Sequence, residues 1–169
     1  MNFIRDFFGG VVDGLVNGAA NMRAAPSNGS ASDHGRIERL CRELGWPVDE
    51  REGNVIRLHF NSSDGEVRKV RISGGDKSLV SIFVASDAVL PVDQVPADLL
   101  GYLLRRNVGD SGIGMWGIMV DDDDDVTFLN YYMALGDGLD AEALKYICES
   151  LTSEAADFDD KLRQAGLLD

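Results

Sequence analysis

The segment GMWGIMVDDDDDVTFLNYYMAL, residues 114–135, places five consecutive aspartates between two apolar stretches. The stretches at 113–120 and 126–135 predict two β-strands, and the aspartates predict the loop of a hairpin. An antiparallel sheet with one face in water normally alternates apolar and polar residues. The second stretch is apolar on both faces, with Val126, Phe128, Tyr132 and Ala134 on one and Leu129, Tyr131, Met133 and Leu135 on the other. Both faces therefore need cover, from helices on one side and from a second subunit, a protein ligand or the N-terminal segment on the other.

The aspartate run has two further interpretations besides a solvated loop. One is a metal site, for which Asp121, Asp123 and Asp125 are the candidate ligands, since calcium takes six to eight oxygens from spaced carboxylates. The EF-hand spacing is absent, because Val126 follows the run directly. The other interpretation is docking on a basic partner surface. We favour the solvated loop, whose charge also discourages aggregation of the adjoining apolar strands.

The remaining chain predicts a single α+β domain at residues 36–165, built around an antiparallel sheet. The expected order is a helix, three strands, a helix, two strands and a long closing helix. For the first helix, Ser32 or Asp33 is the expected N-cap and Gly45 the C-terminal glycine. The other elements expected outside the hairpin are strands at 54–60, 67–72 and 78–86 and helices at 95–107 and 140–164.

The N-terminus predicts a separate amphipathic helix over residues 1–24, whose apolar face includes Phe3, Phe7 and Val11. Several glycines lie inside it, each costing about 1 kcal/mol of helix stability against alanine. Residues 25–35, APSNGSASDHG, predict a flexible linker. We expect the helix to dock on its own domain, on a partner or on a membrane surface. Its few cations disfavour a surface of anionic lipid.

Composition narrows the class of protein. The 169 residues carry a net charge of −13, which disfavours nucleic acid as a partner because binding a phosphate backbone needs clustered cations. The apolar runs are shorter than the ~20 residues of a membrane-spanning helix, and no secretory signal pattern is present. With only two cysteines, a disulfide scaffold is not expected. We therefore expect a cytoplasmic protein.

No pattern of catalytic residues predicts an enzyme or a cofactor. The histidines, His34 and His59, lie in no nucleophile or zinc motif. Cys41 and Cys148 fall on apolar helix stripes, where a free cysteine acts as a small hydrophobe. The glycines of GDSGIGMWG, residues 109–117, lack the Lys-Ser/Thr that follows in a phosphate-binding loop. An enzyme would require unexpected groups such as Glu43, His59 and Tyr102 to gather in one pocket.

Cations on the second and third strands form the other candidate site. If strands 54–60 and 67–72 pair, then Arg57, His59, Lys69 and Arg71 share one face. They form either a solvent-facing surface or a patch that attracts an acidic peptide or the acidic surface of a partner subunit. Together with the hairpin and the N-terminal helix, the candidate partner-binding residues are Trp116, Ile118, Leu129, Tyr131, Met133, Arg57, Lys69, Arg71, Phe3, Phe7 and Val11.

The chain also resembles a known superfamily over residues 33–165. The matching segments are RIERLCRELG (36–45), VIRLHF (55–60), SLVSIFVAS (78–86), VPADLLGYLLRRNV (95–108), the sequence at 112–135 and LDAEALKYICESL (139–151). Their pattern and order resemble the type III secretion chaperone-like superfamily, which includes the Tir-type secretion chaperones and the YbjN-type bacterial proteins. The resemblance implies a non-enzymatic α+β domain, commonly homodimeric, that binds protein segments on its sheet and helix surfaces. The N-terminal extension and the aspartate run depart from that pattern.

Overall fold

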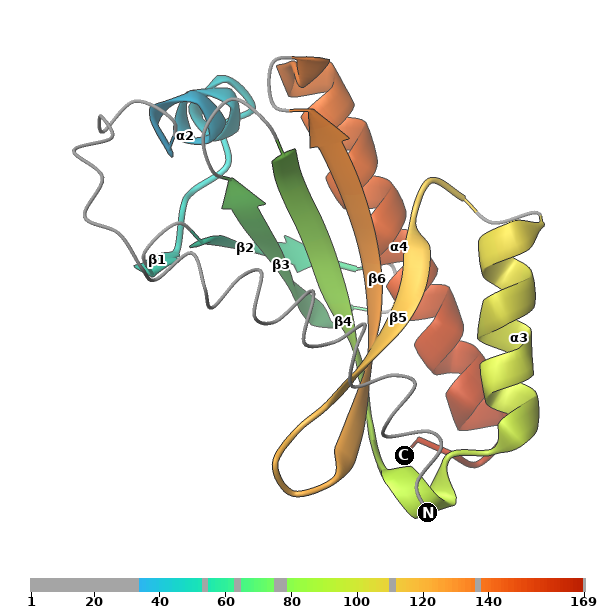
Figure 1. Cartoon of the computed structure of the whole chain (residues 1–169). Helices are drawn as coiled ribbons and strands as arrows, with labels where there is room; N and C mark the ends of the chain where they lie inside the picture. The colour runs from blue at the N-terminus through green and yellow to red at the C-terminus, as the bar shows by residue number, and fades with distance from the viewer. Residues whose placement is uncertain are drawn as a thin grey trace. The chain divides into compact units, whose positions relative to one another are not determined.

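One six-stranded sheet and three helices form the part of the chain that the computed structural model describes, residues 34–52, 55–62, 65–74, 79–109, 112–135 and 138–168. The helices are α2 (His34–Glu43), α3 (Ala97–Val108) and α4 (Ala141–Gln164), with a 3-10 turn, η1 (Val92–Gln94). The strands are β1 (Glu50–Glu52), β2 (Val55–Asn61), β3 (Val67–Gly74), β4 (Leu79–Pro91), β5 (Met115–Val120) and β6 (Asp125–Leu135). All pairings are antiparallel, in the order β1-β2-β3-β4-β6-β5 (Figure 1). The predicted α+β class and element order are confirmed, and β1 is an unpredicted addition.

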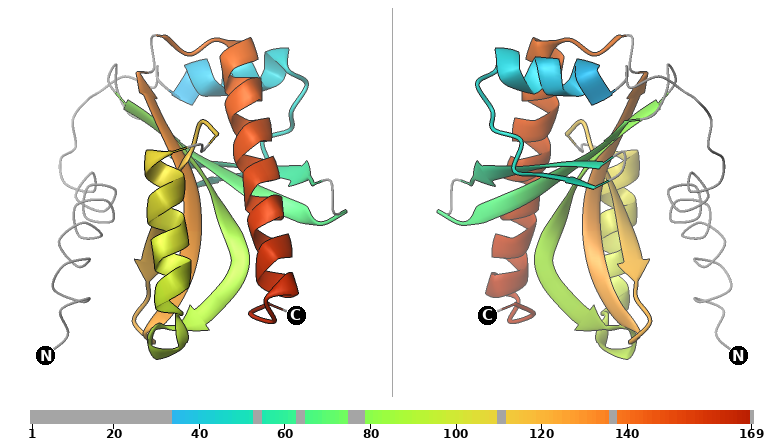
Figure 2. Two further views of the ribbon diagram at one scale, coloured as in Figure 1. Left: turned by 90° about the vertical axis from the view of Figure 1, so that its right-hand side faces the viewer. Right: turned by 90° about the vertical axis from the view of Figure 1, so that its left-hand side faces the viewer.

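The helices cover one face of this sheet (Figure 2). The long helix α4 lies across β4 and β6, α2 packs against α4, and α3 lies along β5 at the sheet edge. Alternate residues of the strands point toward α4, and these form the core, as the buried positions of β2 and β3 illustrate. The largest buried apolar side chains from the strands are Phe128, Ile56, Leu58, Ile72 and Ile82. We call the sheet face that α4 contacts the covered face.

Two helix ends follow the predicted chemistry. The Asp140 side chain accepts a hydrogen bond from the Ala143 backbone N–H at 2.7 Å, and so caps α4. After α2, Gly45 takes a positive φ of 71° and the Trp46 N–H donates to the carbonyl of Cys41 at 2.8 Å. This is the left-handed glycine closure expected of a helix C-terminus. In the described part of the chain, no helix is long and apolar enough to cross a membrane.

The predictions for the N-terminal segment concern residues outside those that the structure describes. They comprise the helix at 1–24 with Phe3, Phe7 and Val11, the linker up to residue 33, and the N-cap at Ser32 or Asp33. These expectations and the domain boundaries stay predictions.

A buried ion pair joins β3 to α4. Arg68 is 2% exposed, Asp159 is 0% exposed, and Arg68 Nη1 lies 2.5 Å from Asp159 Oδ2. The same carboxylate accepts hydrogen bonds from the Ser86 hydroxyl and from the Asp87 backbone N–H, the latter at 3.1 Å. Burying a charge is costly unless it is paired and hydrogen-bonded. Here both oxygens of Asp159 have donors, so removing either charged partner deprives the other of its closest opposite charge at a buried position.

The same cluster stabilises an irregularity in β4. Ala85 pairs with Leu129 and Val89 pairs with Thr127, so three β4 residues lie opposite a single residue of β6. Extra residues in a strand interrupt the regular ladder and leave some backbone groups without a hydrogen-bond partner on the neighbouring strand. At this bulge, the Asp87 N–H donates to Asp159 and the Ala88 N–H donates to the Ser86 hydroxyl at 3.1 Å. Helix α4 therefore supplies the acceptor that the neighbouring strand cannot.

The glycine-rich segment before β5 owes its composition to close packing. A methyl group at Gly114 would overlap the side-chain oxygen of Asn130 and lie 2.5 Å from Leu151 Cδ2. A methyl group at Gly112 would overlap Glu154 on α4. The segment therefore approaches β6 and α4 more closely than any larger residue permits.

Gly114→Ala is expected to lower the free energy of unfolding by about 1–3 kcal/mol, the usual cost of overpacking a core. Urea unfolding of the full chain measures it. Gly138→Ala is the control, because nothing lies within 4 Å of a methyl group there. Equal unfolding midpoints for the two variants would contradict the packing explanation.

Both sheet edges are occupied or protected. At one edge, β1 has three residues, all charged, which is a common protection against strand addition. At the other, α3 lies along β5 and its Asn107 side chain bonds the Trp116 backbone. The Asn107 amide donates to the Trp116 carbonyl at 2.8 Å and its oxygen accepts from the Trp116 N–H at 2.6 Å. The amide thus takes the place of a neighbouring strand.

Candidate functional site

The sheet face opposite α4, here called the open face, has no helix of the described residues packed on it (Figure 2). One row of paired residues crosses all six strands on this face: Glu50, Arg57, Arg71, Phe83, Tyr131 and Met115. The row is charged on β1, β2 and β3 and apolar on β4, β6 and β5. The open face therefore divides into two chemically different halves.

The apolar half is the apolar strip, consisting of Leu79, Phe83, Met115, Met119, Leu129, Tyr131, Met133 and Leu135. Several of these side chains are strongly exposed: 47% for Leu79, 40% for Met115, 40% for Met133 and 61% for Leu135. Leu79 and Leu135 are paired across β4 and β6. The Tyr131 ring lies close to Gly117, since a Cβ atom added at Gly117 would be 3.3 Å from Tyr131 Cε1. Contiguous exposed apolar groups on a soluble protein mark an interaction site.

The charged half is the cationic strip, Arg57, His59, Lys69 and Arg71. The predicted pairing of the two strands is confirmed, since Arg57 pairs with Arg71 and His59 with Lys69. On the β2 side, Arg57 forms an ion pair with Glu50, and His59 Nδ1 lies 2.9 Å from Asp49 Oδ2. On the β3 side, the Arg71 guanidinium lies 5.9 Å from the Phe83 ring centroid. Among the residues that the structure describes, acidic partners thus neutralise the strip on β2 only.

The structure separates the predicted partner-binding residues. Leu129, Tyr131 and Met133 lie on the open face with the cations. Trp116 and Ile118 belong to the covered face, because they pair with the covered residues Asn130 and Phe128. Trp116 is 5% exposed and its ring lies 4.4 Å from that of Phe158 on α4. These two side chains thus pack on the covered face, and their assignment to a partner surface stays a prediction that this placement disfavours.

Sequence reasoning missed part of the apolar strip. Leu79, Phe83 and Met115 were not named, although each is two or four residues from another outward position on its strand. In SLVSIFVAS both faces are mostly apolar, so alternation alone could not assign an outward side. The acidic partners of the cationic strip, Asp49 and Glu50, were also missed. Their charge next to a cationic strand was the available signal.

The aspartates form the tight loop of the β5–β6 hairpin. The Asp121 side chain accepts hydrogen bonds from the backbone N–H groups of Asp123 and Asp125, each at 3.0 Å. Asp124 adopts a positive φ of 62°, which the short polar side chain of Asp tolerates better than most. In the described ranges, no group of three His, Cys, Asp or Glu residues is arranged to hold a metal ion. Asp121 thus stabilises the turn itself.

The remaining chemical candidates do not gather. Glu43 lies at the end of α2, His59 lies on the open face, and Tyr102 on α3 stacks on Phe158 at 6.5 Å on the opposite side of the sheet. Burial raises the pKa of the Cys41 thiol to about 11. Burial, and then the neighbouring Cys41 and Glu149, also raise the pKa of Cys148. Neither buried thiol is poised to act as a nucleophile at neutral pH.

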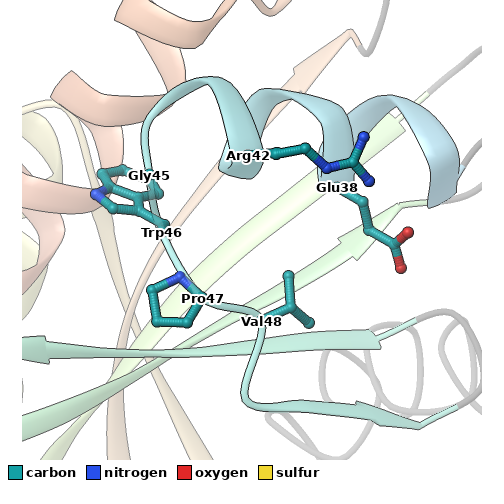
Figure 3. A pocket seen from close by; sticks show the side chains of 6 residues that line it. All are labelled: Glu38, Arg42, Gly45, Trp46, Pro47 and Val48. Atoms are coloured by element: carbon teal, nitrogen blue, oxygen red, sulfur yellow. The ribbon is translucent and has the colours of Figure 1, made fainter.

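A shallow hollow of about 730 Å³ lies beside the end of α2 (Figure 3). Its lining residues are Glu38, Arg42, Gly45, Trp46, Pro47 and Val48. Trp46 packs edge-to-face on Phe60, with the ring centroids 4.8 Å apart. Glu38 forms an ion pair with Arg51. The Trp46 ring and the Glu38 carboxylate thus have structural partners. The residues that line the hollow contain no pairing of a nucleophile with a base.

A family model described as YbjN, a putative bacterial sensory transduction regulator, matches residues 33–164. The chain belongs to the YbjN family. The superfamily resemblance inferred from the sequence is confirmed by this match and by the solved structures below. Comparison with curated proteins found no match.

Three solved structures share the fold of this YbjN-family chain. One is YbjN of E. coli, a putative transcription regulator, at 14% identity and a TM-score of 0.58 over 80% of this chain and 94% of that one. Another is the Yersinia pestis type III secretion chaperone SycH in complex with a stable fragment of YscM2. It gives 18% identity and a TM-score of 0.52 over 73% and 96% of the two chains. The third is the HopA1–SchA chaperone–effector complex, at 12% identity and a TM-score of 0.53 over 75% of this chain and 91% of that one.

Proposed function

We propose that this YbjN-family protein is a non-enzymatic binding module that takes a polypeptide segment of a partner protein on its open face. The carrying observation is the apolar strip, whose exposed Leu and Met and half-buried aromatic side chains lie together on a sheet face that no described helix covers. Aromatic and methionine side chains are enriched at protein interfaces. A homodimer and a cytoplasmic location, expected from the sequence, stay predictions.

The fold comparisons support this proposal. Both chaperone structures contain a protein bound to a chaperone of this fold, a fragment of YscM2 in one and the effector HopA1 in the other. Protected edges also favour it, since the charged β1 and the Asn107 amide leave the face, and not the edge, as the accessible part of the sheet.

Selection from a random-peptide display library, using the full chain as bait, tests the proposal. Leu135→Lys is expected to weaken the binding of the selected peptides at least tenfold, because burying a leucine side chain contributes about 1.5–3 kcal/mol. Leu104→Lys on α3 is the matched control, since Leu104 and Leu135 are each 61% exposed. Fluorescence anisotropy gives the dissociation constants. Peptides that bind both variants equally well would place the binding surface elsewhere and refute the proposal.

A further inference from the structure

The cationic strip contains one pair of like charges across strands and, beside it, a histidine, charged only when protonated, opposite a lysine. Arg57 lies directly opposite Arg71, and His59 lies directly opposite Lys69. Side chains in such positions are about 5 Å apart, and like charges there are destabilising. A sheet that served only as a solvated surface would gain stability from an acid in place of either cation.

The repulsion is relieved on β2 but not on β3. Arg57 has Glu50 as its ion-pair partner and His59 has Asp49. Among the described residues, neither Lys69 nor Arg71 forms an ion pair with a carboxylate. Their unbalanced charge lies on the strand next to the apolar strip.

The register fixes how close the two halves are. Arg71 pairs with Phe83, and Phe83 pairs with Tyr131. Neighbouring strands are about 4.8 Å apart, so Arg71 lies within roughly 10 Å of Tyr131. A polypeptide helix or strand lying on the apolar strip would bring the side chains on one of its flanks over β3.

Local charge outweighs the acidity of the whole chain at this distance. The net charge of −13 repels an acidic partner at long range. At physiological salt, however, charges more than about 8 Å apart are largely screened. A carboxylate in contact with Lys69 or Arg71 therefore responds to these cations first.

We propose that the occupant of the open face is a protein segment with an apolar side and Asp or Glu residues along one flank, whose carboxylates meet Lys69 and Arg71. This inference rests on the proposed function and names the chemistry of the partner. A surface of anionic lipid fits less well, since it binds clusters of several cations. Among the described residues of the open face, only two cations lack a carboxylate partner, and the four exposed aspartates at 121–124 extend from the hairpin that carries most of the apolar strip.

Three synthetic peptides with one apolar stripe and a flank of Glu, Gln or Lys test the inference on the full chain, by anisotropy at low and physiological salt. We expect the Glu peptide to bind at least fivefold more tightly than the Gln peptide, with a smaller ratio at higher salt. In the variant Lys69→Glu/Arg71→Glu, the Lys peptide is expected to bind best and the Gln peptide to bind as before. The unfolding midpoint is not expected to fall, because the new carboxylates face His59 and Arg57.

Arg39→Glu/Lys145→Glu is the matched control, since it changes the net charge equally at exposed positions on α2 and α4. It should leave the preference for the Glu peptide intact. Equal binding of the Glu and Gln peptides, or an equal effect of the two double variants, would overturn the inference. Tight binding to phosphatidylserine vesicles that Lys69→Glu/Arg71→Glu abolishes would overturn it in favour of lipid. If the Gln peptide fails to bind at all, or binds Leu135→Lys equally, the proposed function fails instead.

Discussion

Asp159→Ala is expected to lower the free energy of unfolding by about 3–5 kcal/mol, the usual loss when one partner of a buried ion pair is removed. Arg68 would keep its charge at a position that is 2% exposed, with Asp87 at 3.4 Å as its remaining carboxylate. The Ser86 hydroxyl and the Asp87 N–H would lose their acceptor as well. Since whole proteins are stable by about 5–15 kcal/mol, this one change removes a large part of the total. Urea unfolding followed by circular dichroism measures it.

Asp157→Ala is the control, because Asp157 lies on the same helix but is exposed. Asp157→Ala should change the free energy of unfolding by no more than about 0.5 kcal/mol, as for most surface substitutions. Arg68→Met/Asp159→Leu is expected to regain most of the stability, because apolar side chains of similar volume often replace a buried ion pair without loss. If Asp159→Ala unfolds at the same urea concentration as Asp157→Ala, the ion pair does not hold α4 to β3.

Trp116→Ala is expected to lower the free energy of unfolding by about 3–5 kcal/mol, as for other buried aromatic residues replaced by alanine. The Trp116 ring packs on Phe158, whose own ring lies 5.5 Å from that of Phe128, so the three rings join β5, β6 and α4. The hydrogen bonds with Asn107 involve only the backbone of Trp116 and remain possible. The loss is therefore a packing effect, again measured by urea unfolding.

Met115→Ala is the control for this prediction, since Met115 is the preceding residue on β5 and points to the open face with 40% exposure. Its stability should fall by less than about 1 kcal/mol, while its binding of selected peptides should weaken. The opposite outcome, in which Trp116→Ala keeps its stability and loses binding, would return Trp116 to the partner surface.

The sequence predicted most elements of the sheet because alternation and turn signals are local. Strand β1 escaped prediction, since three charged residues at Glu50–Glu52 have no apolar pattern and become a strand only by pairing with β2. The face on which Trp116 lies could not be predicted for a related reason. Alternation shows that Trp116 and Ile118 share a face, but the covered face depends on where α4 packs.

The buried ion pair shows both the reach and the limit of pattern reading. Arg68 has the same parity as Val70 and Ile72 on β3, and Asp159 follows Phe158 on the apolar stripe of α4. Two opposite charges at core positions were therefore visible in the sequence. Their pairing across 91 residues was not, because no local pattern connects β3 with α4. The surface proposed to bind a partner segment has the same character, since it combines residues of separate strands brought together only by the fold.

The Asn107 amide on the Trp116 backbone has a consequence for selectivity. A free strand edge accepts almost any extended chain, because the hydrogen bonds are made by the backbone that all sequences share. With this edge filled by an asparagine side chain and the opposite edge charged, that indiscriminate route is closed. Under the proposed function, a partner bound on the sheet face would instead be recognised by its side chains, so we expect the protein to discriminate among segments by their composition.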